Sequence, residues 1–154
     1  MSIVANIFER ASVVAEALTW RGTPYHHCAD LKGVGVDCAL ILMRVYANVG
    51  LVEFVDPRPY DPQWHLHRSE EMYIGWLERM GARQVQAPGL GDVALFRFGR
   101  CFSHGGIVVE APGAPDSLAD TQILHSYIDR GVHLTRLREE PLDGREHQFW
   151  SLWP

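Results

Sequence analysis

The stretch Gly33-Val34-Gly35-Val36-Asp37-Cys38-Ala39-Leu40-Ile41-Leu42 joins a glycine-rich loop to an apolar segment, with a cysteine at the junction. Residues 39–49 contain no proline or glycine, and their apolar residues recur at the three- and four-residue spacing of a buried helix face. Asp37 is a candidate N-cap, which places Cys38 in the first turn. Unpaired N–H groups and the helix dipole stabilise an anion there, so we expect a lowered thiol pKa and a nucleophilic Cys38. The alternative is a small, buried, unreactive cysteine.

Four further segments accompany this junction in order: Trp20-Arg21-Gly22-Thr23-Pro24-Tyr25, Gly91-Asp92-Val93-Ala94-Leu95-Phe96, Ser103-His104-Gly105-Gly106-Ile107-Val108 and Ile123-Leu124-His125-Ser126. With residues 33–38, they resemble the motifs of the NlpC/P60 cysteine peptidases in order and spacing. Those motifs carry an entrance tyrosine, the nucleophile, a Gly-Asp strand, the catalytic histidine and a third polar residue. The resemblance implies a papain-like NlpC/P60 fold.

Two segments, Tyr60–Arg68 and Phe96–Gly106, more narrowly resemble the branch found in bacteriophage tails and gene-transfer-agent particles. The resemblance to this branch implies hydrolysis of peptidoglycan stem peptides, at a bond between D-glutamate and a diamino acid. It also implies synthesis in the bacterial cytoplasm, assembly into a virion tail with tail-tip, hub or baseplate proteins, and action at the periplasm and cell wall during DNA delivery. One departure from the family pattern leaves the identity of the cleaved bond undetermined. The family more often has Ser-Gly where Ala39-Leu40 stand, and that serine can take part in substrate binding.

Bulk properties limit the classes of protein to consider. A chain of 154 residues that is 47% hydrophobic fits a single domain, residues 1–154. The net charge of −5 and the scattered basic residues argue against nucleic acid as a partner. No apolar run is long enough for a membrane span, and we expect no secretion signal. Three cysteines argue against a disulfide framework and for synthesis in a reducing compartment.

The order of predicted elements indicates an α+β fold. Helices are expected over 3–18, 39–49 and 70–80, the last capped by Ser69, and residues 26–35 are expected to form a surface loop. Five strands are then expected, over 92–98, 104–110, 121–127, 131–137 and 147–153. Short connections make them antiparallel neighbours, so an antiparallel sheet should pack on the cysteine helix.

A nucleophilic cysteine needs a base and a group that orients the base. His104 is expected to begin its strand and act as the base, with His125 on the next strand as the orienting residue. The alternatives are a solvent-bonded edge histidine for His104 and a buried, backbone-bonded one for His125. Tyr25 and the Cys38 N–H could stabilise an oxyanion, although Tyr25 could equally pack its ring at the domain edge. Because Cys28 lies in a loop and Cys101 in a predicted turn, only Cys38 should be reactive near pH 6.

Neither a metal nor a cofactor is expected. Of His26-His27-Cys28, at most two side chains could converge, because neighbours on an extended chain point to opposite faces. His65-Leu66-His67 could place two ligands on one face, but no third is signalled nearby. Trp64, with His65, could line a substrate groove, dock a partner or form a self-packed lid.

The sequence therefore predicts a Cys38–His104–His125 hydrolase of amide bonds that works through an acyl-enzyme, with Tyr25, Asp37 and Trp64 in the oxyanion and substrate-binding region. A catalytically silent structural subunit of the tail hub or baseplate is the alternative. A zinc-binding assembly module is a third hypothesis.

Overall fold

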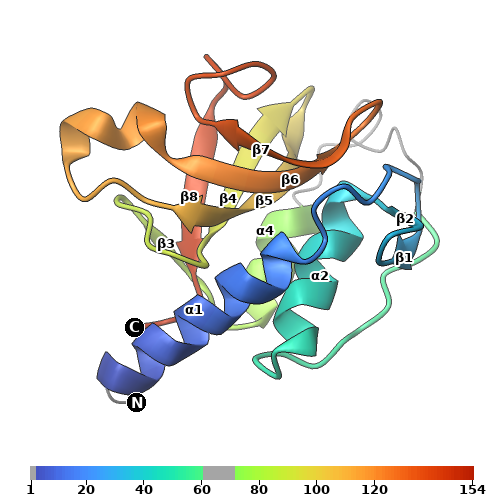
Figure 1. Ribbon diagram of the computed structural model, residues 1–154, viewed down its shortest axis with the longest axis horizontal. Helices are drawn as coiled ribbons and strands as arrows, with labels where there is room; N and C mark the ends of the chain where they lie inside the picture. Colours follow the sequence, from blue (N-terminus) through green and yellow to red (C-terminus); the bar gives the residue numbers. More distant parts are fainter. Residues whose placement is uncertain (1–2, 61–71) are drawn as a thin grey trace.

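The computed structural model describes residues 3–60 and 72–154, and the three α-helices in these ranges lie together against a sheet (Figure 1). The helices are α1 (Ile3–Leu18), α2 (Cys38–Asn48) and α4 (Met72–Arg79). All three positions agree with the expected helices, whereas the predicted cap Ser69 lies outside the described residues. The architecture is α+β, as predicted. None of the described helices is long and apolar enough to cross a membrane.

The main sheet has six strands in the order β3-β8-β4-β5-β6-β7, and every neighbouring pair is antiparallel. The five expected strands correspond to β4 to β8. The sixth, β3, was not expected. The bounds are β3 (Arg83–Val85), β4 (Val93–Phe98), β5 (Cys101–Glu110), β6 (Gln122–Tyr127), β7 (Gly131–Arg136) and β8 (His147–Ser151).

Three local expectations need correction. The predicted loop 26–35 contains part of a small hairpin, β1 (Asp30–Leu31) with β2 (Gly35–Val36). Strand β5 begins at Cys101, so that cysteine is a buried strand residue and not a turn residue, and His104 lies inside the strand. The connection from β5 to β6 contains a 3₁₀ helix, Pro115–Asp120.

Strand alternation divides the core into two clusters. In β4, Val93 and Leu95 belong to the cluster that includes the helices, whereas Ala94 and Phe96 belong to a smaller one that includes Leu142. Both sets are fully or almost fully buried, as expected where successive side chains point to opposite faces of a covered sheet. The sheet therefore has an apolar core on each side.

The approach of α2 and α4 to β5 depends on a glycine. A Cβ atom on Gly105 would lie 2.8 Å from Cδ1 of Leu42 in α2 and 3.2 Å from Cε1 of Tyr73 in α4. The neighbouring Gly106 instead faces β6, where a Cβ would lie 2.5 Å from Cγ2 of Ile123. The first glycine therefore lets the helices reach the sheet, and the second lets two strands pack closely.

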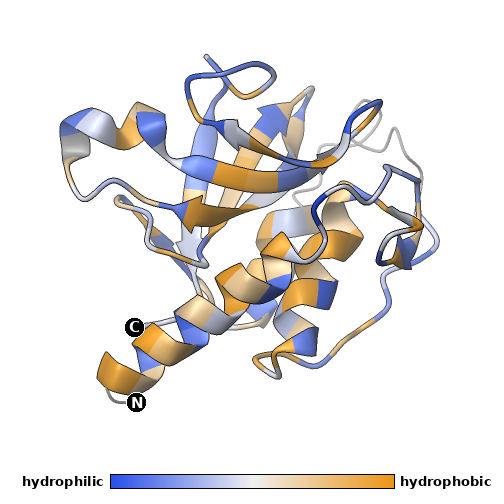
Figure 2. Cartoon of the chain, viewed as in Figure 1, coloured by the Kyte–Doolittle hydropathy of each residue, from blue (hydrophilic) through white to orange (hydrophobic). Residues whose placement is uncertain are grey.

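Helix α1 directs its charged side chains toward the protein and exposes apolar ones at its N-terminal end, where Figure 2 shows hydrophobic colouring. Arg10 pairs with Asp92 at 2.9 Å, and its guanidinium lies 4.3 Å from the ring centroid of Trp153. The indole N–H of Trp153 donates to Glu9 at 3.3 Å. These contacts hold α1 against Asp92, directly before β4, and against Trp153, which follows β8.

Candidate active site

Cys38 is the first residue of α2, and Asp37 is its N-cap, as predicted. One oxygen of the Asp37 carboxylate accepts hydrogen bonds from the backbone N–H groups of Ala39 at 3.1 Å and Leu40 at 2.9 Å. The extended backbone of Asp37 leaves its carboxylate at the open end of the helix, where these N–H groups have no helical acceptor. The cap therefore fixes the position of Cys38.

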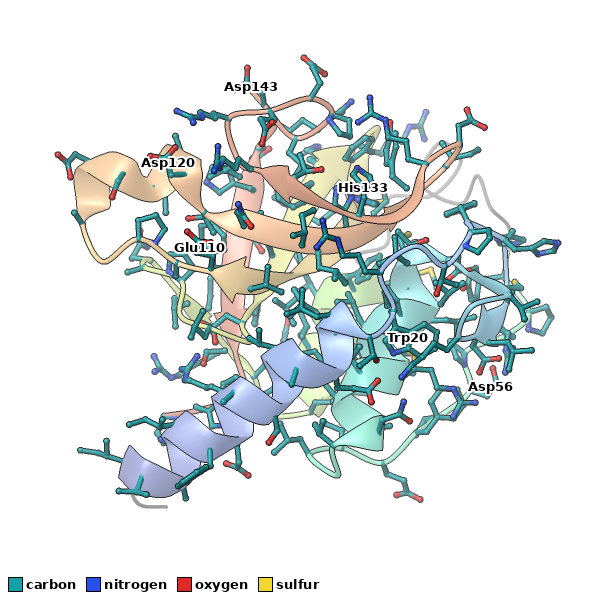
Figure 3. The ribbon with its side chains drawn as sticks, in the orientation of Figure 1. Trp20, Asp56, Glu110, Asp120, His133 and Asp143 are labelled. Atoms are coloured by element: carbon teal, nitrogen blue, oxygen red, sulfur yellow. The ribbon has the colours of Figure 1, made fainter. Side chains whose placement is uncertain are left out.

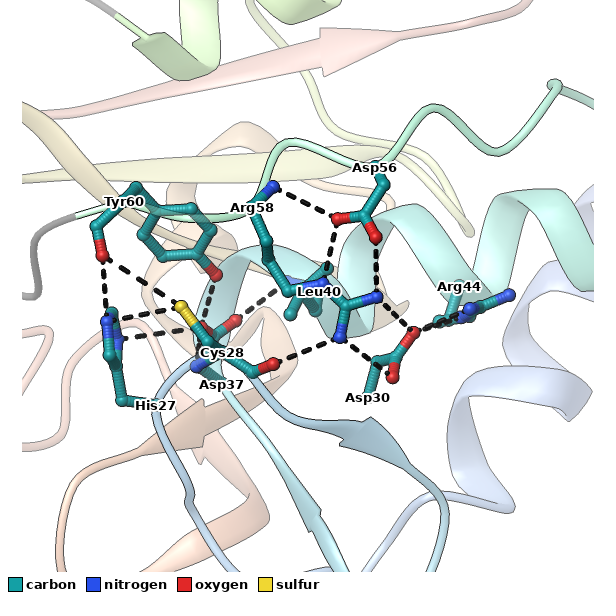
Figure 4. A network of polar contacts seen from close by, with 9 residues as sticks. All are labelled: His27, Cys28, Asp30, Asp37, Leu40, Arg44, Asp56, Arg58 and Tyr60. Atoms are coloured by element: carbon teal, nitrogen blue, oxygen red, sulfur yellow. Dashed lines mark hydrogen bonds and ion pairs between the residues drawn. The ribbon is translucent and has the colours of Figure 1, made fainter.

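The second oxygen of Asp37 ties two other segments to the start of α2 (Figure 4). It accepts the N–H of Cys28 at 2.8 Å and the hydroxyl of Tyr60 in a very short hydrogen bond, and it lies 3.9 Å from Nδ1 of His27. Asp37 is only 1% exposed, and both of its oxygens are already accepting hydrogen bonds from the protein. Asp37 also lines the cavity that holds Cys38, but its hydrogen bonds within the protein favour a structural role. Contact between Asp37 and substrate stays a prediction.

An ion-pair network anchors the segment that carries Tyr60. Arg58 contacts Asp56 at 2.7 Å and Asp30 at 3.2 Å, and Arg44 in α2 contacts Asp30 at 2.6 Å (Figure 4). The network connects residues 56–60 to β1 and to α2. The sequence contained no local signal for it, because its charges come from four separate positions.

His104 and His125 lie diagonally across the β5–β6 pair, and their side chains meet. Nε2 of His104 is 2.8 Å from Nδ1 of His125, and Nε2 of His125 is 2.8 Å from the hydroxyl oxygen of Thr135 in β7. Both histidines are buried, at 6% and 0% exposure. With Nε2 of His104 engaged in this chain, Nδ1 is the ring nitrogen that can accept a proton from a thiol.

One pair of neutral tautomers satisfies both contacts and also leaves Nδ1 of His104 as an acceptor. In it, His104 donates from Nε2 to Nδ1 of His125, and His125 donates from its own Nε2 to the hydroxyl oxygen of Thr135. His133 lies beside the chain on β7, with its ring 4.5 Å from that of His125 (Figure 3).

A cavity of about 220 Å³ brings the predicted residues together. Cys38, His104, Tyr25 and Asp37 all line it, and His125 lies behind His104.

The sequence missed Tyr73, because the segment 70–80 carried no chemical signal. Its hydroxyl donates to Sγ of Cys38 at 3.1 Å. Sequence reasoning also missed the roles of Thr135 and Tyr60, because each acts through a contact with a residue that is distant in the sequence.

The surroundings of Cys38 do not favour the expected thiolate. Burial, and then the Asp37 carboxylate, raise the pKa of the Cys38 thiol to about 12, although the hydroxyl of Tyr73 and the N–H groups of Cys38 and Ala39 act to lower it. Burial, with Arg145 and His133 nearby, lowers the pKa of His104 to about 3. Both causes oppose the predicted lowering of the Cys38 pKa, although the Cys38 side chain is only partly buried; the lowering stays a prediction. These surroundings favour a neutral thiol and a neutral imidazole.

Two groups of candidate ligands or substrate contacts lie apart from the cavity residues. Trp64, His65 and His67 lie outside the described residues. Elsewhere, His27, Cys28 and Asp37 have ligand atoms within 4.8 Å of one another, a grouping that the sequence did not predict because Asp37 is distant along the chain. Nε2 of His27 bonds the carbonyl oxygen of Tyr60 at 2.9 Å, and Asp37 is occupied as described above. A cation would have to displace these hydrogen bonds, so no metal site is predicted here.

The likeness of this chain to known proteins lies in its fold. No family model matches the chain, and no curated protein matches it. Among solved structures, the crystal structure of the NlpC/p60 domain of the peptidoglycan hydrolase SagA is similar, with a TM-score of 0.54 and 20% sequence identity. The match covers 90% of this chain and 96% of that domain. The chain therefore has the fold of an NlpC/P60 domain.

Proposed function

We propose that this protein is a cysteine peptidase that hydrolyses peptidoglycan stem peptides. The observation that carries the proposal is the shared cavity: Cys38, at the start of α2, and His104 both line it, and His104 is hydrogen-bonded in turn to His125 and Thr135. A nucleophile, a base and two groups that orient the base are the components of an acyl-transfer site. The similarity to a peptidoglycan hydrolase domain supports the choice of substrate.

The reaction begins with an uncharged pair. As the Cys38 sulfur attacks the amide carbonyl carbon, Nδ1 of His104 takes the thiol proton, and the imidazolium is stabilised through His125. The oxyanion forms near the backbone N–H of Cys38, with Tyr25 in the same cavity wall as a second donor. His104 then returns the proton to the leaving amine. Water attacks the thioester in the second half-reaction, with His104 again as base, and releases the acid.

The finer assignment rests on the motifs in the sequence. We infer that the bond lies between D-glutamate and a diamino acid, and that the protein works in the tail tip of a phage-like particle beside hub or baseplate proteins. In that setting it opens the cell wall locally while DNA is delivered.

The test is incubation with purified peptidoglycan, followed by mass analysis of the released fragments. The wild type should release peptides with a new amino terminus at a diamino acid, and Cys38→Ala should release none. If the folded wild type releases nothing under conditions where a related peptidase is active, the protein is instead a structural subunit that kept the fold without the activity.

A further inference from the structure

Helix α1 turns its charged side chains inward, which is the reverse of an ordinary surface helix. Its charged residues are Glu9, Arg10 and Glu16. Besides the contacts of Glu9 and Arg10 described above, Glu16 accepts the indole N–H of Trp20 at 2.8 Å. Figure 1 shows α1 on the outside of the molecule, so the opposite face of the helix is left to solvent.

The solvent-facing side of α1 forms an uncharged stripe. Within residues 3–19, every exposed side chain is uncharged, and we call these exposed side chains the α1 stripe. Ile3, Val4, Ile7 and Phe8 are each at least 60% exposed, and Leu18 extends the stripe to the other end of the helix. The exposed area of these five residues is on the order of 600 Å², more than most monomeric proteins leave in one apolar patch. An apolar face of this size indicates an interaction surface.

The polar groups of the α1 stripe do not need solvent. The hydroxyl of Ser12 donates to the carbonyl oxygen of Phe8 at 2.9 Å, and the hydroxyl of Thr19 donates to a carbonyl oxygen of the last helical turn at 2.6 Å. The other small members of the stripe are Ala11 and Ala15. Covering the stripe would therefore bury no charge and no hydroxyl without a partner.

The order of large and small side chains fits a second copy of the same helix. In an antiparallel pair with its twofold axis at Ala11, Ile7 of one copy faces Ala15 of the other, Val4 faces Leu18, and the two Ala11 residues meet. Large side chains from one half of each helix then lie over small ones from the other half, and the alanines let the helices approach closely. The antiparallel direction also brings the positive end of each helix dipole beside the negative end of the other.

A membrane surface fits the α1 stripe less well than a second copy does. Helices that lie in a membrane interface carry Lys and Arg beside their apolar face. The one basic residue of α1, Arg10, pairs with Asp92 within the protein, and the chain has a net charge of −5. A second copy brings no charged residue of α1 onto the stripe and needs none.

We propose that the protein forms a twofold-symmetric dimer through the α1 stripe, with two antiparallel copies of the helix at its centre. With its small residues included, the stripe approaches the roughly 800 Å² per partner that a standard stable interface buries. No residue of the stripe lines the cavity that holds Cys38, so the contact uses none of the candidate active site. The inference goes beyond the proposed peptidase function and does not depend on it.

Sedimentation equilibrium across the micromolar concentration range measures the association. The wild type should dimerise with a dissociation constant in the micromolar range. Ile7→Lys should weaken the dimer by at least about tenfold, because its ammonium group would enter a contact that has no charge to pair with it. Val55→Lys, at a similarly exposed apolar residue outside α1, is the matched control and should dimerise like the wild type. Thermal midpoints show whether each variant stays folded.

A charge swap tests the register of the two helices. Ala15→Glu alone should also weaken the dimer, whereas Ile7→Lys and Ala15→Glu combined in one chain should restore it at low salt, because each ammonium then faces a carboxylate. A parallel pair would instead bring like charges together. A monomeric wild type, a dimer that Ile7→Lys does not weaken, or a combined variant that stays monomeric would overturn the proposal. If the monomeric wild type binds phosphatidylcholine vesicles, the stripe is a membrane contact instead.

Discussion

At the scale of single residues, the surroundings of Cys38 and His104 favour the uncharged form of each. In many cysteine-dependent sites a neighbouring cation stabilises the thiolate. Here the neighbour of Cys38 is the carboxylate of Asp37, and burial lowers the pKa of His104, which favours the neutral imidazole. Proton transfer is therefore expected to accompany attack on the substrate instead of preceding it.

The pH dependence of alkylation checks this state. A thiol with a raised pKa reacts faster as the pH rises, because more thiolate is present. Cys28 and Cys38 are both partly exposed, and we expect iodoacetamide to label Cys38 slowly at pH 6, no faster than Cys28, with the rate still increasing above pH 9. Peptide mapping by mass spectrometry measures each site. A Cys38 rate that is already maximal at pH 6 would show a thiolate–imidazolium pair and contradict the neutral one.

The histidine pair has a division of roles that substitution can test. His104→Ala removes the base and should reduce kcat at least 10³-fold, because nothing else near Nδ1 accepts the proton. His125→Asn should keep measurable activity, since an amide oxygen can still accept from Nε2 of His104. Rates of peptide release from peptidoglycan give the comparison, with circular dichroism as the control for folding. Equal loss in both folded variants would mean that His125 does more than orient.

Thr135 allows a milder test of the same chain. Thr135→Val preserves shape but leaves Nε2–H of His125 buried without an acceptor, which costs about 1–3 kcal/mol of stability. We expect a lower unfolding midpoint in urea and a modest fall in kcat with KM unchanged. A variant as stable as the wild type would show that the Thr135 hydroxyl does not hold His125.

At the scale of elements, the start of α2 depends on one carboxylate. Asp37→Ala removes the N-cap and leaves the Cys28 N–H and the Tyr60 hydroxyl without their acceptor. The expected loss is about 3 kcal/mol in the free energy of unfolding, from the cap and the unpaired groups together. Asp143→Ala, on an exposed turn, is the matched control and should leave the stability unchanged. Comparable stabilities of the two variants in urea would exclude this role.

The elements differ in how far the sequence could predict them. Helix α2 and strands β4 to β6 were predictable, since their apolar residues follow the local period of a helix or a buried strand. Strand β3 was not, because Arg83-Gln84-Val85 holds a single apolar residue and becomes a strand only by pairing with β8. Tyr73 and Thr135 escaped for a similar reason: their side chains matter through contacts made across the fold. The pKa of Cys38 depends on burial, which local spacing does not reveal.

At the scale of the whole molecule, the buried histidines couple stability to pH. His104 and His125 have folded pKa values of about 3 and about 2, whereas an unfolded histidine titrates near 6.5. Between those values the unfolded chain binds more protons, so stability is fully present above pH 6.5 and falls as the pH drops through the window. Burial is the first cause for both residues, and for His125 the nearby His104, His133 and Arg130 add to it.

Thermal unfolding followed at several pH values checks the coupling. The midpoint should fall steadily from pH 6.5 to pH 4, with a loss on the order of a few kcal/mol in unfolding free energy. His125→Asn should flatten part of this slope, because one titrating group is gone. A midpoint that stays constant across the window would contradict the neutral buried pair.

The sheet order also has a consequence for how the protein is made. Strand β8 follows every other strand in the sequence, yet it pairs with both β3 and β4 within the sheet. During vectorial synthesis, Cys38, His104 and His125 all leave the ribosome before β8, while one side of β4 still lacks its partner. An unpaired strand edge favours aggregation and association with chaperones. A ribosome-bound chain that stops before residue 147 should therefore remain sensitive to proteolysis, and it should become resistant only when β8 has emerged.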